Sequence, residues 1–150
     1  MRKAAVLVLL LLLVTGCGGP STDTGEVVPI SQVCSYEKWK TVAVEGYLSP
    51  DIMHCERASK GRRGIIWCTF RVYQTPDYAG ASLSVQIPIT SWLNGKNNHM
   101  EEPGNTSKNV QIYDNNGNLI PTGSKIRVFG ELPKSDFCEF GLAKRIDRIS

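Results

Sequence analysis

The side chains that could do chemistry in this 150-residue sequence are mainly its five cysteines. A cysteine thiol can be modified, can pair with a second cysteine as a disulfide, or can bind a metal ion. Cys17 stands apart from the other four, because it follows an uncharged apolar run over residues 4–14 and precedes a glycine-rich segment. A run of about eleven residues is too short for a membrane-spanning helix, which needs about 20. Its length, and the positive charges of Arg2 and Lys3 before it, indicate the apolar region of a secretory signal.

The residues Val14-Thr15-Gly16-Cys17 indicate which kind of signal this is. An aliphatic residue, two small residues and a cysteine in this order resemble the bacterial lipobox. The resemblance implies that residues 1–16 are a signal peptide that is removed. Cys17 would then carry a diacylglycerol on its sulfur and usually a further acyl chain, such as palmitate, on its new amine. Each buried CH₂ contributes about 0.8 kcal/mol, so two or three chains would anchor the protein to a membrane almost permanently. The alternative is an ordinary signal peptide that is cut nearby.

The segment that follows Cys17 is expected to be a flexible tether. Residues 17–32 are rich in small and turn-forming residues and have little to bury. The remaining residues, 33–150, are enough for one folded domain. Removal of Arg2 and Lys3 leaves 15 basic side chains against 14 acidic ones, a net charge near +1. A general nucleic-acid-binding domain carries a strong positive excess, so this balance disfavours nucleic acid as a partner.

The other four cysteines form an even set, which fits disulfides in an oxidising compartment. Four cysteines allow three pairings. We favour one bond that closes a local loop, Cys55–Cys68, and one that ties the start of the domain to its last strand, Cys34–Cys138. A metal site that uses His54 and Cys55 is disfavoured, because neither a C-x-x-C pair nor an H-x₃-H spacing is present.

Apolar residues alternate with polar ones in five segments of the chain. Period-2 alternation bounded by turn residues is typical of half-buried strands. Helix signals are weak, and only residues 90–100 could hold a short helical turn. The sequence therefore predicts an all-β domain with strands over residues 41–48, 65–73, 82–89, 125–132 and 137–149.

Two of these strands each contain a glycine at the same position of a common pattern, Val42-x-Val44-x-Gly46 and Ile126-x-Val128-x-Gly130. A glycine inside a strand usually marks a bend or bulge, and strands in small closed barrels need such bends. The layout resembles the OB-fold, a small five-stranded Greek-key barrel. Residues 110–123 also resemble that superfamily, because a polar hairpin with an Asn-Gly turn leads into the fourth strand. SH3-like and other small β-barrels share the pattern and stay open as alternatives.

The resemblance implies a ligand-binding surface on the outer face of the second and third strands and in the adjoining loops. Aromatic rings can stack on bases or sugars, at about 1–3 kcal/mol per base, and arginine adds a positive charge. The alternative is structural, because exposed aromatics also stabilise neighbouring strands and a basic loop is often only solvated. The candidate ligand-binding residues are Trp67, Arg71, Tyr73 and Gln86 on the strands and Arg62 and Arg63 in the loop.

Catalytic groups are scarce in the sequence. His54 and His99 lie outside any recognisable motif, and no G-x-S-x-G, H-E-x-x-H or phosphate-loop pattern is present. The pair Glu101-Glu102 is expected to lie in an exposed loop. We therefore expect no catalytic residues, no metal site and no cofactor.

The sequence as a whole predicts a lipid-anchored, extracytoplasmic protein of the bacterial cell envelope. Its β-barrel would bind or scaffold an envelope protein or a small ligand without catalysis. Gly18 stands where an aspartate would retain a lipoprotein at the inner membrane, which favours the outer membrane if the cell is Gram-negative. The alternative function is the capture of single-stranded nucleic acid or an anionic oligosaccharide by the aromatic and basic face.

Overall fold

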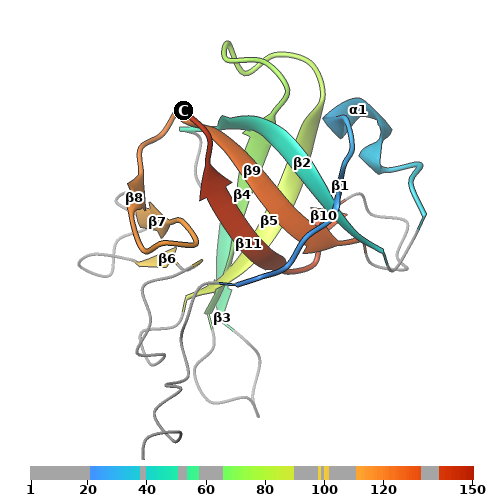
Figure 1. Ribbon diagram of the computed structural model, residues 1–150. Helices are drawn as coiled ribbons and strands as arrows, with labels where there is room; N and C mark the ends of the chain where they lie inside the picture. Colours follow the sequence, from blue (N-terminus) through green and yellow to red (C-terminus); the bar gives the residue numbers. More distant parts are fainter. Residues whose placement is uncertain are drawn as a thin grey trace, which may run out of the picture.

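The computed structural model describes residues 21–37, 40–50, 54–57, 66–89, 98, 100–101, 111–132 and 139–150, with the backbone alone at 54–57, 66–67, 88–89 and 101. Strands form nearly all of its regular structure, with one short helix (Figure 1). The elements in chain order are β1 (Glu26–Val27), α1 (Ile30–Val33), β2 (Thr41–Leu48), β3 (His54–Arg57), β4 (Ile66–Tyr73), β5 (Ser82–Ile89), β6 (Met100–Glu101), β7 (Gln111–Tyr113), β8 (Leu119–Ile120), β9 (Lys125–Glu131), β10 (Glu139–Phe140) and β11 (Ala143–Arg148).

The all-β prediction is confirmed, but the number of strands is larger than the predicted five. Four predicted strands correspond to β2, β4, β5 and β9 with nearly the same bounds. The fifth is divided into β10 and β11, with Gly141 and Leu142 between them. The additional strands have two to four residues each, too few to show an alternating pattern in the sequence.

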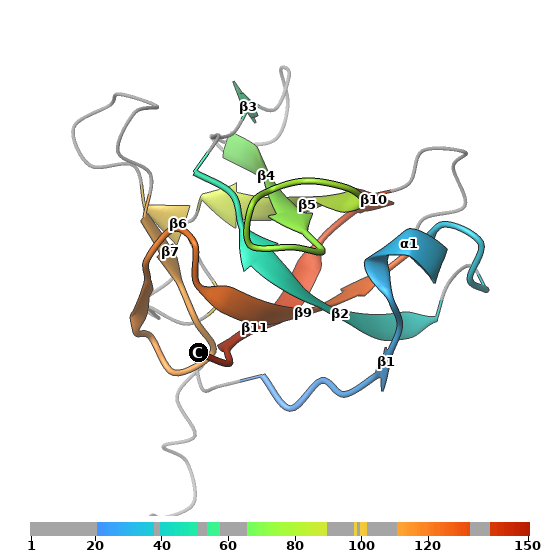
Figure 2. The same ribbon diagram turned by 90° about the horizontal axis from the view of Figure 1, so that it is seen from above.

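The strands pair into two sheets. The main sheet follows the order β10-β5-β4-β2-β9-β11, with β1 added beside β2 and β3 beside β4. The β1–β2 and β10–β5 pairs are parallel and the other pairs are antiparallel, so the main sheet is mixed. It curls strongly, which places β2, β9 and β11 opposite β4 and β5 (Figures 1 and 2).

The smaller sheet has the order β6-β7-β8. Its β7–β8 hairpin is the polar hairpin predicted over residues 110–123, and Gly117 in its turn has a φ of 78°. Such a φ is one that glycine adopts at little cost. The sequence did not predict β6 or a second sheet.

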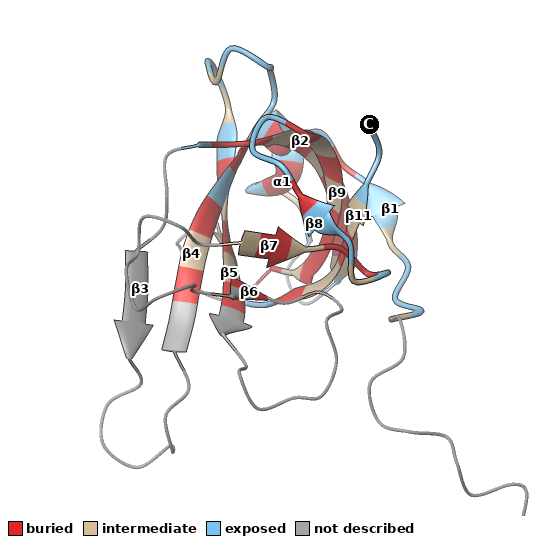
Figure 3. Ribbon diagram, turned by 90° about the vertical axis from the view of Figure 1, so that its left-hand side faces the viewer, coloured by how far each residue is buried: buried red, intermediate tan, exposed pale blue. Residues whose placement is uncertain are grey.

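One hydrophobic core fills the space inside the curled sheet (Figure 3). The alternation predicted from the sequence determines its lining, because every second residue of the long strands points inward. The inward residues include Val42 and Val44 on β2, Cys68, Phe70 and Val72 on β4, Leu83, Val85 and Ile87 on β5, and Ile126 and Val128 on β9.

The two strand glycines mark places where a neighbour approaches closely. A β-carbon on Gly46 would meet the carbonyl oxygen of Tyr73 and lie 2.7 Å from Cγ1 of Val72. A β-carbon on Gly130 would lie 2.5 Å from both Cγ and Cδ2 of Phe140. Real β-carbon contacts are longer than this, so neither position accepts a side chain without a shift of its surroundings.

Residues 21–32 are packed on the domain, whereas the sequence predicted a flexible tether over 17–32. β1 pairs with the beginning of β2, and α1 follows it directly (Figure 1). The side chains of Val28, Ile30 and Val33 are buried in the core. These three residues gain enough from burial to hold a segment whose composition otherwise resembles a linker. The signal peptide (1–16), Cys17 and the first residues of the expected tether lie outside the described residues.

Candidate binding face

The outer face of β4 and β5 brings together three of the predicted ligand-binding residues. The strands pair along their whole length, and the register places Thr69 beside Gln86, Arg71 beside Ser84 and Tyr73 beside Ser82. The residues between them point into the core, so these six side chains point outward. Arg71 and Ser82 are exposed, and the other four are half-buried.

The remaining predicted candidates cannot be placed in the same way. The side chain of Trp67 is outside the described part of the structure, although its backbone pairs with Pro88. Arg62 and Arg63 lie outside the described residues, as does His99.

Two further tyrosines adjoin Tyr73 and were not among the predicted site residues. Tyr47 on β2 is the direct neighbour of Tyr73 across the strand pair. Tyr78 packs edge-on against Tyr73, with ring centroids 5.8 Å apart and an interplanar angle of 74°. All three rings are half-buried and therefore keep some surface in contact with solvent. We call Tyr47, Tyr73 and Tyr78 the tyrosine cluster.

The loop between β4 and β5 holds Tyr78 in a strained conformation. Its φ of 58° lies in the left-handed region, which is costly for a bulky residue. The loop is closed by the amide of Gln74, which donates to the Ala81 carbonyl at 3.0 Å. Inside it, the Tyr78 amide donates to the Thr75 carbonyl at 3.1 Å, and the Thr75 hydroxyl donates to the Ala79 carbonyl at 2.7 Å. These hydrogen bonds hold the ring of Tyr78 against Tyr73.

Charged side chains on the outer face of β2, β9 and β11 form ion pairs. Glu45 accepts a hydrogen bond from Nε of Arg127 at 2.9 Å and lies 3.6 Å from Nζ of Lys125. The hydrogen bond from Arg127 is the main cause that lowers the pKa of Glu45. On the same face, Lys144 pairs with Glu131 at 3.0 Å.

The guanidinium of Arg71 differs from these paired charges. In the described part of the chain it has no ion pair or hydrogen bond. Glu139 on β10 lies on the same face, because it is the register partner of Ser84 on the side opposite Arg71. Within the described residues, the face thus carries one cation without an ion pair, a carboxylate on the neighbouring strand and a group of aromatic rings, which suits contact with a polar ligand.

Both cysteines whose side chains the structure describes take part in disulfides. Cys34 and Cys68 are each disulfide-bonded, and Cys68 is fully buried. Cys55 is the direct register partner of Cys68 in the β3–β4 pair. Cys138 lies outside the described residues.

Within the described residues, no three side chains of the His, Cys, Asp and Glu types lie where they could hold a metal ion. No helix of the described segments is both long and apolar enough to cross a bilayer. Comparison with known proteins gave no family model and no curated protein that matches this chain.

Proposed function

We propose that this chain is a lipid-anchored protein of the bacterial cell envelope whose extracytoplasmic domain is a non-enzymatic binding module. The anchor is Cys17, on the resemblance of Val14-Thr15-Gly16-Cys17 to a lipobox. The binding surface is the outer face of β4 and β5 together with the tyrosine cluster. The observation that carries this assignment is the guanidinium of Arg71, which has no ion pair or hydrogen bond among the described residues and lies on the same face as three partly exposed tyrosine rings. Such a combination offers stacking and charged hydrogen bonds to an envelope protein or a small ligand.

The domain is proposed to be an OB-like barrel. The segment that contains β10 and β11 supports this, because it lies at both ends of the sheet order. β10 pairs in parallel with β5, β11 pairs antiparallel with β9, and only two residues separate them. One bent strand would thus bring the ends of the path together, as in a partly open Greek-key barrel.

The proposed disulfides are Cys55–Cys68 and Cys34–Cys138. Residues directly opposite in an antiparallel pair have Cα atoms about 4.5–5.5 Å apart, within the range that a disulfide spans. Cys55 and Cys68 are opposite in this sense. Cys34 directly follows α1, which contacts β5, and Cys138 directly precedes β10, which pairs with β5. Both pairs would suit a chain that folds in an oxidising compartment.

A photo-cross-linking experiment in intact cells tests the binding face. A photoreactive residue in place of Ser84 is expected to yield a discrete adduct that disappears when Tyr73→Ala and Arg71→Ala are added. The control has the photoreactive residue in place of Arg148, an exposed position on β11, and is expected to give no such adduct. An adduct that forms equally from both positions, or that survives the double substitution, would show that the face is wrongly assigned.

The anchor is tested separately by mass spectrometry of the mature N-terminus. We expect Cys17 to carry diacylglycerol, and Cys17→Ser to leave an unprocessed, unacylated precursor. An unmodified Cys17 thiol in the mature protein would refute lipid anchoring.

A second candidate function is the binding of single-stranded nucleic acid or an anionic oligosaccharide to the same face. The unpaired charge of Arg71 beside aromatic rings favours it, but the carboxylate of Glu139 on the same face opposes a polyanion. Salt distinguishes the two, because phosphate-dominated binding weakens steeply with ionic strength. Binding that falls severalfold between about 50 and 200 mM salt would favour this second candidate.

A further inference from the structure

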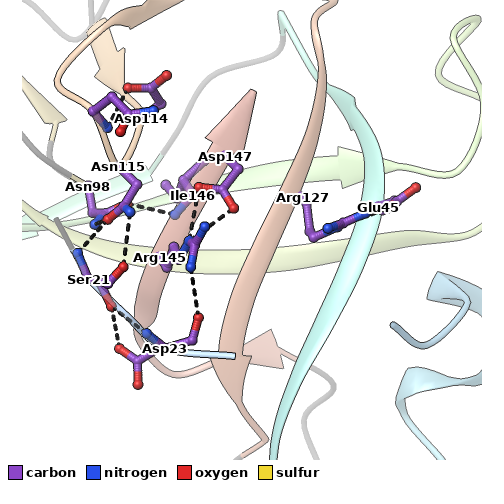
Figure 4. A network of polar contacts seen from close by, with 11 residues as sticks. Ser21, Asp23, Glu45, Asn98, Asp114, Asn115, Arg127, Arg145, Ile146 and Asp147 are labelled. Carbon is purple, nitrogen blue, oxygen red and sulfur yellow. Dashed lines mark hydrogen bonds and ion pairs between the residues drawn. The ribbon is translucent and has the colours of Figure 1, made fainter. Parts of the chain in front are cut away.

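The first described residue of the chain is held on the domain at two points. The amide of Ser21 donates to Oδ1 of Asn115 at 2.7 Å, and Nδ2 of Asn115 donates back to the Ser21 carbonyl at 3.0 Å (Figure 4). Asn115 is almost fully buried, in the turn of the β7–β8 hairpin. A buried amide that uses both its donor and its acceptor on one backbone unit fixes that unit in position.

Asn115 is itself held firmly by β11 and by Asn98. Nδ2 of Asn98 donates to Oδ1 of Asn115 at 2.6 Å, and Oδ1 of Asn98 accepts from the amide of Ile146 at 2.7 Å (Figure 4). The amide of Asn115 donates to the Ile146 carbonyl at 2.6 Å. The clamp on Ser21 is therefore part of a connected network rather than a single surface contact.

The residues that follow Ser21 remain attached to the domain. Nη1 of Arg145 donates to the Asp23 carbonyl at 3.2 Å. A β-carbon on Gly25 would lie 2.8 Å from the carbonyl oxygen of Thr41, so the backbone passes against β2 at contact distance. The amide of Val28 then donates to the Ala43 carbonyl at 2.8 Å. We call residues 21–28 the strap.

We infer that the strap holds one defined end of the domain against the membrane, an inference that rests on the proposed lipid anchor at Cys17. Only four residue steps join Cys17 to Ser21, and a fully extended chain covers at most about 3.6 Å per step, or roughly 14 Å. A flexible tether over residues 17–32 would allow several times this reach. The clamp removes that freedom, so the surface around Asn98, Asn115 and Ser21 must rest on the lipid headgroup layer.

Because the surface around Ser21 rests on the membrane, the orientation of the binding face relative to the bilayer is also determined. The loop between β4 and β5, which carries Tyr78, lies toward the opposite end of the molecule from the start of the strap (Figures 1 and 3). β4 has eight residues and runs from about the height of the start of the strap up to this loop (Figure 1). At about 3.3 Å per residue it spans roughly 26 Å. The tyrosine cluster is thereby held at the end of the domain that points away from the bilayer, toward a partner that is not in the same membrane leaflet.

The test uses the full acylated chain in vesicles of phosphatidylethanolamine and phosphatidylglycerol. Hydrogen exchange measures the protection of the strap amides. Energy transfer from a fluorescent residue in place of Asp77 to an acceptor lipid measures the distance of the β4–β5 loop from the bilayer surface. The variants are Asn115→Ala, its neighbour Asn116→Ala as a matched control, and an insertion of about twelve Gly and Ser residues between Pro20 and Ser21. Asn116 is exposed and its side chain makes no hydrogen bond within the described residues.

We expect the amides of Ser21, Asp23 and Val28, each of which donates a hydrogen bond, to be protected in the wild type and in Asn116→Ala. Asn115→Ala should exchange about tenfold faster over residues 21–23, because two hydrogen bonds to Ser21 are lost. The insertion adds a coil of roughly 19 Å span, so the distribution of distances between position 77 and the bilayer should become at least about twice as wide. The strap amides should still be protected in this variant. Strap amides that exchange at unfolded rates in the wild type, or an insertion that leaves the distribution unchanged, would overturn the inference. A chain that fails to bind vesicles while its strap stays protected would instead refute the lipid anchor, and the orientation with it.

Discussion

Gly130→Ala should lower the free energy of unfolding by about 2 kcal/mol. The added β-carbon would lie 2.5 Å from Cγ and Cδ2 of Phe140 and 3.0 Å from its Cβ, where carbon atoms normally stay about 3.5–4.0 Å apart. The Phe140 ring is fully buried, so it cannot turn toward solvent. The backbone of Gly130 cannot retreat either, because it pairs with Val42 on one side and Ala143 on the other.

The magnitude follows from two opposing effects. Overpacking a rigid core costs about 1–3 kcal/mol, and contact with a ring at this distance falls at the upper end of that range. Replacing a strand glycine recovers about 0.5–1 kcal/mol of backbone entropy. The net loss is therefore about 2 kcal/mol, which equilibrium urea unfolding of the disulfide-intact protein resolves easily.

A double-mutant cycle with Phe140→Leu separates this clash from a general strand effect. The smaller side chain makes room for the new methyl group, so the double variant should be less destabilised than the sum of the two single variants, by about 1 kcal/mol or more. Gly141→Ala is the matched control, because nothing lies within 4 Å of the position of its β-carbon, and its effect should stay within about 0.5 kcal/mol. A loss below about 0.5 kcal/mol for Gly130→Ala, or strictly additive effects, would refute the reasoning.

Three further predictions concern stability. The hydrogen bond from Arg127 lowers the pKa of Glu45, so the stability that this carboxylate contributes is present above its ordinary pKa of 4.5 and is lost as the pH falls through the folded value. The difference in unfolding free energy between wild type and Glu45→Gln, measured by urea unfolding from pH 7 to pH 3, should therefore shrink below pH 4.5. The buried Asp114 carboxylate accepts from the amides of Asn116 and Asn118, so Asp114→Ala should cost about 2–3 kcal/mol in thermal unfolding, and an unchanged melting temperature would contradict this. Cys68→Ala should remove about 3 kcal/mol with its disulfide, and a reactive thiol at position 68 in the unfolded, unreduced wild type would refute that loss.

The long strands were predictable because every second residue in them is apolar and buried. On β4, the inward set of Cys68, Phe70 and Val72 follows directly from alternation, and the partner strand β5 shows the same period. The predicted outward placement of Arg71, Tyr73 and Gln86 followed from the same rule. A period of two specifies both the strand and the face of each residue, so no knowledge of the partner strand is needed.

The strap and the tyrosine cluster could not be predicted in this way. β1 has two residues, and its stability comes from pairing with β2, which leaves no local pattern to read. Tyr47 and Tyr78 join Tyr73 only through the register of β2 on β4 and through a backbone angle in the loop. Such long-range contacts depend on tertiary structure, which a propensity argument does not include.

The position of β10 and β11 has a consequence for the order in which the chain can fold during synthesis. These two strands come after all the others in this sequence, yet they supply partners for both β5 and β9. Ser21 and Asp23, near the other end, bind Asn115 and Arg145. A nascent chain that has not yet added residues 139–148 therefore lacks the contacts that complete the core, and it should stay unfolded until these residues are available. With so many pairings between distant parts of the chain, we expect folding to take roughly milliseconds to seconds.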